Sequence, residues 1–523
     1  MDSSGEKTGK CTEAVKEDLK ESAAAACAQS SRGCCHICVP RFIPSVYRNE
    51  LVQLSKLAGP VVISQFMIFM ISFVSTVFCG HLGKTELAAV ALSIAVINVT
   101  GISIGTGLSL TCDTLISQTY GSGNLKRVGV ILQRGVLILL LACFPCWAIL
   151  INTEPLLLAV KQSPEVASLS QLYVKIFMPA LPAAFMYHLQ GRYLQNQGII
   201  WPQVITGAIG NVFNAIFNYV LIHQLDLGVA GSAAASAISQ YLLASVLFIY
   251  MYLRGLHKAT WAGWSLDCLQ EWGPFARLAV PSMLMLCLEW WVVEVGGFLA
   301  GVISEAELGA HLISYELTVT AYMVTPVNLL TFAYMLTCII FGVSKDVIGY
   351  IFTSEPNLCL CLQAVAGGVV RGVGKQSVGA LCNLVGYYFI GLPTGVSLMF
   401  AAKMGVVGFW TGLTVCVFVQ SIFFITFLCK LDWKKAAEEV RTYSNHIQTP
   451  ISTIGSSGES AGVDHVYMEV QIPEESQTTN TTTVGDVLSV SQLVVRRGLA
   501  ILIMILILAA GVITNTVLTP LLK

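Results

Sequence analysis

The feature that most constrains this sequence is a series of long apolar runs, which together fill most of its 523 residues. A helix needs about 20 mostly apolar residues to cross the hydrocarbon core of a bilayer. The run at 356–370 is the shortest, with an apolar part well below that length. We expect thirteen spanning helices, at 57–79, 87–110, 128–151, 166–187, 199–222, 229–253, 274–302, 308–328, 329–352, 356–370, 376–400, 405–429 and 498–520.

The composition agrees with a membrane protein. Charged residues make up 11% of the chain and hydrophobic residues 55%, whereas soluble globular proteins carry about 25% charged residues. The net charge of −1 gives no electrostatic basis for nucleic acid as a partner. The 17 cysteines are scattered, which argues against a secreted disulfide scaffold and against a zinc array. We expect an all-α polytopic membrane protein, and no cleaved signal peptide, because a polar stretch precedes the first apolar run.

The positions of lysine and arginine beside short loops predict the orientation, because these residues accumulate on the cytoplasmic side. If the N-terminus is cytoplasmic and the C-terminus extracellular, these lysines and arginines all fall on the cytoplasmic side. The stretch 431–496 is rich in Ser, Thr, Glu and Gly and is predicted to be a flexible cytoplasmic linker. The basic residues on the predicted cytoplasmic side are Arg41, Arg48, Lys56, Lys126, Arg127, Arg192, Arg254, Lys258, Arg277, Arg371, Lys375, Lys430, Lys434, Lys435, Arg441, Arg496 and Arg497.

An internal repeat divides the spans into two halves. The motif at 57–60 (LAGP) matches 278–281 (LAVP), and 86–88 (ELA) matches 307–309 (ELG), both at an offset of 221. Further along, a weaker resemblance links residues 191–192 and 197–198 to residues 370–371 and to Gly372 and Gly374. The motif at 228–231 (GVAG) matches 405–408 (GVVG) at an offset of 177. Chance matches in apolar sequence are the alternative. Repeats of this kind are typical of transporters, with the substrate site between the halves.

We therefore predict two lobes of six spans related by a pseudo-two-fold axis along the membrane normal. The expected organisation is a cytoplasmic N-terminal segment (1–56), a first lobe (57–253), a loop (254–273), a second lobe (274–430), a linker (431–496) and a final span (497–523). Because the offset falls from 221 to 177, the second lobe is about 44 residues shorter (221 − 177). The shortfall is predicted to lie between Tyr322 and Arg371, as an internal deletion.

Three acidic residues lie within predicted spans, where a charged side chain is costly. Glu289 and Glu294 are five residues apart, which places them about 140° apart around a helix and about 7.5 Å apart along it. They are expected to line two sides of one cavity, with Glu316 on the following span. A carboxyl group desolvated in a cavity can hold either a proton or an organic cation. A structural hydrogen bond of a protonated carboxyl group is the alternative role.

Aromatic and amide side chains accompany these acids. Trp290, Tyr315 and Tyr322 can attract a cation through their rings, or serve as interfacial anchors. Gln65 and Asn98 interrupt the first two spans, where an amide more often joins helices than binds a ligand. The sequence contains no P-loop and no motif of a hydrolase or metalloprotease, so we expect no nucleotide, no cofactor, no metal and no enzymatic activity.

Several motifs in combination resemble the multidrug and toxin extrusion (MATE) family, specifically its vertebrate proton/organic-cation antiporters. They cover nearly all of 50–430, and the extra span after a polar linker resembles the animal branch. The motifs are LAGP at 57–60, FCGHLG at 78–83, QGRYLQ at 190–195, LEWW at 288–291, ELGA at 307–310, YEL at 315–317, GYY at 386–388 and GLP at 391–393.

The resemblance implies a V-shaped pair of lobes and alternating-access export of organic cations against inward protons. It implies Glu289, Glu294 and Glu316 as carboxylates for the cation and the proton, with the cavity lined by Gln65, Asn98, Trp290, Tyr315 and Tyr322. It also implies the plasma membrane as location, apical in polarised epithelia. A further carboxylate that the family carries in the tenth span is missing here, so a truncated form that regulates a partner without transporting is the alternative function.

Overall fold

A computed structural model describes residues 45–304, single positions between 307 and 315, residue 363, residues 366–435, position 438 and residues 489–522. The chain divides into Met1–Gln53 and Leu54–Lys523. Of the first unit only Ser45–Gln53 is described, as the beginning of a helix. All other described residues belong to the second unit.

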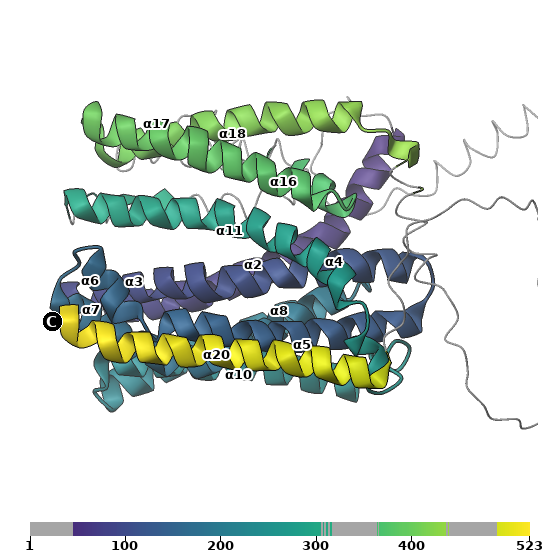
Figure 1. The fold of residues 1–523 in the computed structure, drawn as a ribbon, viewed down its shortest axis with the longest axis horizontal. Helices are drawn as coiled ribbons and strands as arrows, with labels where there is room; N and C mark the ends of the chain where they lie inside the picture. The colour runs from purple at the N-terminus through teal and green to yellow at the C-terminus, as the bar shows by residue number, and fades with distance from the viewer. Residues whose placement is uncertain are drawn as a thin grey trace, which may run out of the picture. The chain divides into compact units, whose positions relative to one another are not determined.

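The described residues are helical almost throughout and include no β-strand. Several spans consist of two helices joined by a short π- or 3₁₀-helix, which is given a label with η. Figure 1 shows that most of the long helices run in roughly the same direction. The elements are α2 (Ser45–Gly80), α3 (Lys84–Ile97), η1 (Asn98–Ile102), α4 (Ser103–Gly121), α5 (Leu125–Leu150), α6 (Thr153–Ala159), α7 (Pro164–Phe177), η2 (Met178–Ala180), α8 (Leu181–Gln195), α9 (Trp201–Asn218), η3 (Tyr219–Gln224), α10 (Gly228–Leu253), η4 (Leu266–Leu269), α11 (Trp272–Ile303), α16 (Gln376–Asn383), η6 (Leu384–Gly391), α17 (Leu392–Val396), η7 (Ser397–Ala401), α18 (Gly405–Lys430) and α20 (Val490–Leu522).

Ten helices in the described parts of the chain are long and apolar enough to cross a membrane. They coincide with ten of the thirteen predicted spans, so the prediction of an all-α polytopic protein is confirmed. The spans predicted at 308–328, 329–352 and 356–370 lie outside the described residues, apart from single positions and the helical residues 366–370. The ten are Gly59–Gly80, Thr85–Gly121, Leu125–Leu150, Pro164–Gln195, Trp201–Gln224, Gly228–Leu253, Trp272–Ile303, Gln376–Ala401, Gly405–Lys430 and Ser491–Leu518.

Local sequence explains where the spans begin and end. The side chain of Asn124 accepts a hydrogen bond from the backbone N–H of Arg127 (3.4 Å) at the start of α5, and Ser163 does the same for Val166 (3.4 Å) at the start of α7. Gly123 follows α4 with a φ of 81°, a conformation that favours glycine. These signals place short turns between long apolar helices.

The helices pack into two regions that share α11. In the first, α4 contacts α5 and α8, α3 contacts α7, and α10 contacts α7, α8 and α9. In the second, α18 packs on η6, α17 and η7. Helix α11 packs against α4 on one side and against α16 on the other. Its residues Phe275 and Ala279 belong to the first apolar core, whereas Val292 and Ala300 belong to the second.

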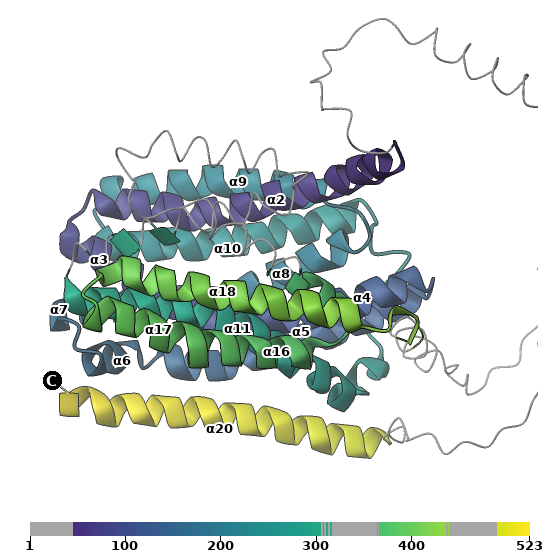
Figure 2. The same cartoon turned by 90° about the horizontal axis from the view of Figure 1, so that it is seen from above.

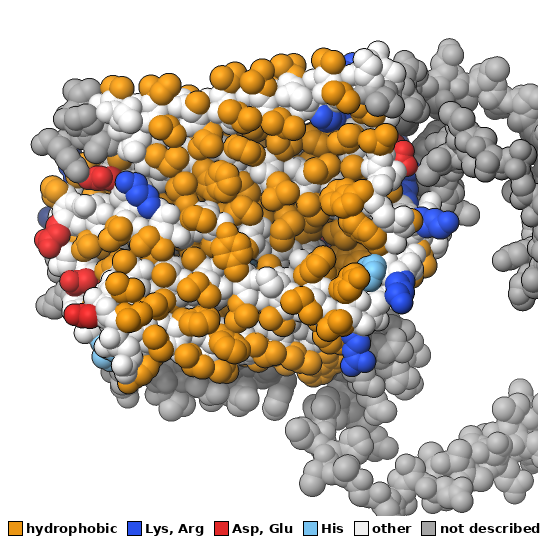
Figure 3. Space-filling model, turned by 90° about the horizontal axis from the view of Figure 1, so that it is seen from below, with side chains coloured by type: hydrophobic (Ala, Val, Ile, Leu, Met, Phe, Trp, Pro, Cys, Tyr) orange, Lys and Arg blue, Asp and Glu red, His pale blue; other side chains and the backbone are white. Residues whose placement is uncertain are grey.

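The outer surface of the bundle is apolar, as expected for contact with lipid. Figure 3 shows hydrophobic side chains over the middle of one face, most of the visible lysines and arginines at one end, and most of the acidic residues at the other. We call the end at which α5 and α11 begin and α18 finishes the basic end. This distribution follows the rule that underlies the predicted orientation.

The internal repeat is visible in the backbone. Asp226 and Gly228 have φ values of 52° and 52°, and Lys403 and Gly405, at an offset of 177, have φ values of 55° and 58°. The hydrogen bonds before them repeat as well, since the N–H of 225 and of 402 donate to the carbonyls of 220 (3.0 Å) and 397 (3.2 Å). The two halves therefore share local geometry as well as sequence.

The turn between the fourth and fifth spans corrects one predicted pairing. Gly198 and Gly374 have φ values of 74° and 79° and donate to the carbonyls of residues 195 and 371, respectively. This register, an offset of 176, pairs positions 194–195 with 370–371, so the predicted pairing of 191–192 with 370–371 is wrong. Short apolar matches do not fix register to within a turn, whereas backbone hydrogen bonds do.

Candidate functional site

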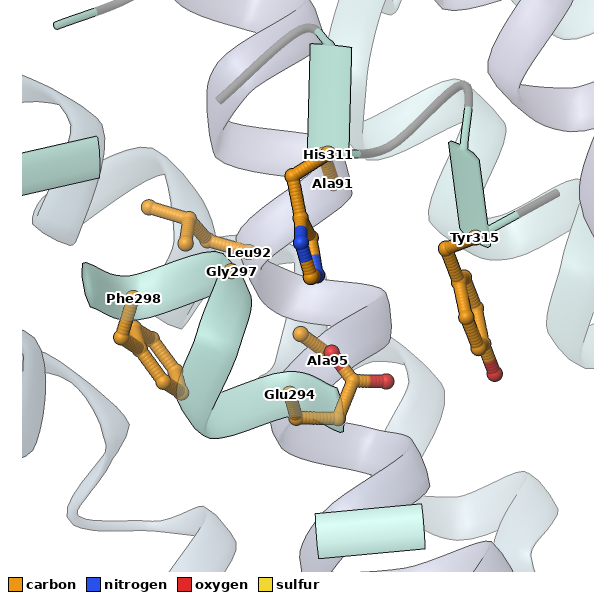
Figure 4. A pocket seen from close by; sticks show the side chains of 8 residues that line it. All are labelled: Ala91, Leu92, Ala95, Glu294, Gly297, Phe298, His311 and Tyr315. Carbon is orange, nitrogen blue, oxygen red and sulfur yellow. The ribbon is translucent and has the colours of Figure 1, made fainter. Parts of the chain in front are cut away.

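A cavity lies where α3 of the first half meets α11 of the second. Its accessible volume is about 30 Å³, which is room for about one or two water molecules. The empty space around it, open solvent included, amounts to about 400 Å³. Figure 4 shows its lining, which consists of Ala91, Leu92 and Ala95 from α3, Glu294, Gly297 and Phe298 from α11, and His311 and Tyr315.

The polar groups of this cavity come from two elements. Glu294 projects from the middle of α11, while His311 and Tyr315 lie at helical positions four residues apart and so share one face. In Figure 4 the carboxyl group of Glu294 lies between the Tyr315 ring and the His311 ring. The remaining lining is apolar, so a carboxylate here is surrounded by little water. This arrangement suits a small positively charged group or a proton on the carboxyl group.

Glu289 lies in a different environment on the same helix. It is half-buried and does not line the cavity. The positive charge of Arg371, which lies in the unlabelled helical stretch 366–372, acts on its carboxyl group, although the described residues show no ion pair between them within 4 Å. The two acids of α11 therefore do not share this cavity, contrary to the expectation from their spacing.

Trp291, two residues after Glu289, joins the two halves. Trp291 Nε1 donates hydrogen bonds to the carbonyl of Val99 (2.8 Å) and to Ser103 Oγ (3.2 Å). Val99 lies in the π-helix η1, whose wider turn interrupts the usual hydrogen-bond ladder of a helix. Trp290, beside it, is half-buried and outside the cavity lining. This part of α11 is thus a contact between the halves.

The other predicted site residues are placed as follows. Asn98 is the first residue of η1 and Gln65 lies in α2; both are half-buried and neither lines the cavity. Glu316 and Tyr322 lie outside the described residues. Of the eight predicted residues, the cavity brings together Glu294 and Tyr315.

Sequence reasoning did not assign His311, Phe298 or the three residues of α3 to the site. The spacing of His311 and Tyr315 was the one sequence feature that could have indicated a shared position in the site, because residues four apart on a helix lie on the same face. Phe298 follows Glu294 at the same spacing. Ala91, Leu92 and Ala95 are ordinary residues of an apolar span, and only the placement of α3 across the cavity from α11 gives them this position.

Comparison with known proteins places the chain in a family. The MatE family model matches residues 60–220. Multidrug and toxin extrusion protein 1 of Danio rerio is 57% identical, covering 94% of each chain. The Homo sapiens protein of the same name is 46% identical and covers 90% of this chain and 94% of that one.

A solved structure shows the same fold. The eukaryotic MATE transporter AtDTX14 superposes with a TM-score of 0.68 at 26% identity, covering 76% of this chain and 99% of that one. The alignment with the Danio rerio protein extends over 557 positions, more than the 523 residues of this chain. This chain therefore lacks residues at some positions that its relative occupies. The chain belongs to the multidrug and toxin extrusion (MATE) family of membrane transporters.

Proposed function

We propose that this protein exports organic cations, including cationic drugs and toxins, in exchange for protons. The observation that carries the proposal is the cavity between α3 and α11, which combines the carboxyl group of Glu294 with the rings of Phe298 and Tyr315. An acidic group with aromatic neighbours attracts an organic cation both by charge and through the ring faces. The names of the relatives, multidrug and toxin extrusion proteins, support a broad range of substrates.

In the proposed mechanism, the carboxyl group of Glu294 holds either a proton or the cation. Proton binding from outside neutralises the carboxylate and releases the cation outward, and loss of the proton to the cytosol restores the site. Alternating access requires the halves to separate on one side at a time, and α11, which belongs to both apolar cores, is the element that joins them. Glu289 and Glu316 are proposed to bind the proton or the cation at other stages, with Gln65, Asn98, Trp290 and Tyr322 as additional lining.

The test is uptake of a labelled quaternary ammonium dye into proteoliposomes driven by a pH gradient. Glu294→Gln removes the exchangeable charge and keeps the shape of the side chain, so we expect at least a tenfold loss of uptake, in line with about 1.5–3 kcal/mol for a charge-assisted interaction. Glu165→Gln is the matched control, because Glu165 is exposed in the first turn of α7. Undiminished uptake by Glu294→Gln would remove Glu294 from the mechanism.

We further propose the plasma membrane as location, apical in polarised epithelia, with the basic end on the cytosolic side. The proposal rests on the distribution of charge in Figure 3 and on the family resemblance. An epitope tag after Lys523 should react with antibody on intact cells, and a tag before Met1 only after permeabilisation.

The second candidate function is that of a non-transporting form that regulates a full-length relative. The shortened second half favours it, because the offset of the repeat falls from 221 at the start to 176 near Gly374. Absence of dye uptake together with co-purification of a full-length relative would support this candidate and contradict the first.

A further inference from the structure

Helix α4 of the first half and helix α11 of the second half lie against each other (Figure 1). A Cβ added at Gly107 in α4 would lie 2.7 Å from the Cα atom of Met283 in α11, a distance that real Cβ atoms do not reach. Because the neighbouring atom belongs to the backbone, no change of rotamer could make room for a side chain at position 107. Glycine is therefore what allows the two halves to meet at this point.

The contact continues along both helices at a regular spacing. One turn from Gly107, Cys287 Sγ donates to Ser103 Oγ (3.6 Å), and another turn further Trp291 Nε1 donates to the carbonyl of Val99 (2.8 Å). The contacts are four residues apart on each helix and their order is reversed, as expected for two helices that run in opposite directions. We call this contact the seam; its facing pairs are Gly107 with Met283, Ser103 with Cys287 and Val99 with Trp291.

The seam lies between the cavity and the basic end. Helix α11 begins at the basic end and passes Met283 and Trp291 before it reaches Glu294. Nearer to the basic end than the seam, Phe275 and Ala279 are buried in the first apolar core. Beyond Trp291, α11 faces α3 across the cavity. Along α11, the two halves are thus closed from the basic end as far as Trp291, and the cavity follows.

We propose that the seam is a gate at the basic end, closed in the conformation described here. It must part before the carboxyl group of Glu294 can exchange its proton or cation with that side. This inference rests on the proposed function, which requires access to the site from each side in turn. A side chain at position 107 would keep α4 and α11 apart and so shift the population towards the open conformation.

The first test detects opening of the seam through Cys287, which is fully buried in it. The purified full chain in detergent is treated with N-ethylmaleimide, and the alkylation of each cysteine is followed by peptide mass spectrometry. We expect Cys287 to react severalfold faster in Gly107→Leu than in the wild-type protein, because the open seam exposes its thiol.

Two buried cysteines and one glycine provide the controls. Cys112 faces Gly135 within the first half and Cys416 faces Gly391 within the second, so the alkylation of both should stay slow when only the seam opens. Gly121 lies on the same helix as Gly107, and none of the described atoms is within 4 Å of a Cβ there. Gly121→Leu should therefore leave all alkylation rates unchanged.

The second test locks the seam. Ser103→Cys places a second thiol opposite Cys287, so mild oxidation with iodine should join the two residues by a disulfide, which the masses of the peptides reveal. We expect pH-driven dye uptake by this variant to be lost on oxidation and restored by dithiothreitol, whereas the oxidised wild-type protein keeps its uptake.

Alkylation of Cys287 that is no faster in Gly107→Leu, or equally accelerated at Cys112 and Cys416, would overturn the proposal of a gate. Failure of the disulfide to form, or uptake that continues after it has formed, would overturn it as well. Absence of uptake by the wild-type protein would instead contradict the proposed transport alone, because the alkylation of Cys287 is measured without a substrate. The two proposals thus fail on different measurements.

Discussion

At the scale of single residues, the clearest link between the halves is the indole of Trp291. Its Nε1 reaches the carbonyl of Val99 (2.8 Å) and the hydroxyl of Ser103 (3.2 Å) on the opposite half. In an apolar environment these groups have no water to replace the lost partner. The contact therefore contributes stability as well as alignment of α11 with η1.

We expect Trp291→Phe to lower the melting temperature of the purified protein, because the free energy of unfolding should fall by about 1–2 kcal/mol. The measurement is thermal unfolding in detergent followed by tryptophan fluorescence. Trp410→Phe is a matched control with the same change in shape, because Trp410 Nε1 has no hydrogen-bond partner in the described structure. Equal destabilisation by both substitutions would mean that ring volume, and not the hydrogen bonds, accounts for the effect.

The candidate site was only partly predictable at this scale. Glu294 and Tyr315, which line the cavity, were predicted from sequence, because a charged or polar aromatic residue within an apolar span is conspicuous. His311 was interpreted as structural and not as a site residue, because its position depends on the carbonyl of Val293 and on rings of α18, which is distant in the sequence. The position of Glu289 outside the cavity likewise depends on packing, since helical geometry gives the angle between two side chains and not the element that each one meets.

At the scale of elements, the final helix α20 lies along the side of the bundle and contacts α5 and α6 (Figure 2). Near the basic end, Arg497 donates to the carbonyl of Leu269 (2.9 Å from Nε) and lies over the ring of Trp272 (4.2 Å). Further along, the carbonyl of Gly511 accepts from Asn152 Nδ2 (2.9 Å). These contacts show that α20 and α5 run in the same direction.

A glycine permits the close approach of α20 to α5. A Cβ at Gly511 would lie 2.7 Å from Ala148 Cβ and 2.8 Å from its carbonyl oxygen, closer than real atoms approach. Small residues at such positions allow helices to associate in membranes. Hydropathy predicts α20 as a span but carries no information on this docking, because both sides of the contact are ordinary apolar sequence.

Substitution of this glycine should detach the helix. If residues 1–440 and 485–523 are produced as separate chains, we expect the second to co-purify with the first, and Gly511→Ile to reduce recovery severalfold. Gly498→Ile on the same helix is the control, because none of the described atoms lies within 4 Å of a Cβ there. Recovery that is unchanged by Gly511→Ile, or reduced as much by Gly498→Ile, would show that the glycine contact does not hold α20.

At the scale of the whole molecule, helix directions constrain the part of the second half that separates α11 from α16. Asn383 Nδ2 donates to the carbonyl of Met285 (2.8 Å), and Tyr387 shares an apolar cluster with Val292, so α16 and η6 run parallel to α11. The chain thus leaves α11 at the end opposite to the basic end and begins α16 at the basic end. The three spans predicted from sequence for the stretch between them are an odd number, and they stay a prediction.

The second half has few residues available for three spans. In the first half, the stretch from Glu86 to Leu194 contains three spans, and the equivalent stretch from Glu307 to Val370 is shorter, because the offset falls from 221 to 176 across it. Three crossings of about 20 residues each need about 60 residues, which is nearly the whole of this second stretch. The repeats and most spans were predictable, because hydropathy and sequence periodicity can be read from short stretches of sequence. The path of the shortened segment was not, because it depends on whether turns of only a few residues can connect three spans.

We predict that residues 307–370 cross the membrane three times, with tight turns near Asn328 and near Thr353. An epitope tag inserted after Asn328 should then react with antibody only in permeabilised cells, whereas a tag after Thr353 should react on intact cells. Tags in the linker at 441–488 and after Lys523 provide the internal and external references. If residues 307–370 instead cross once, this alternation cannot occur, because a single crossing never returns the chain to the outer side. Detection of the two tags on the same side, or in the reverse order, would therefore exclude three crossings and identify the second half as a lobe with fewer spans than the first.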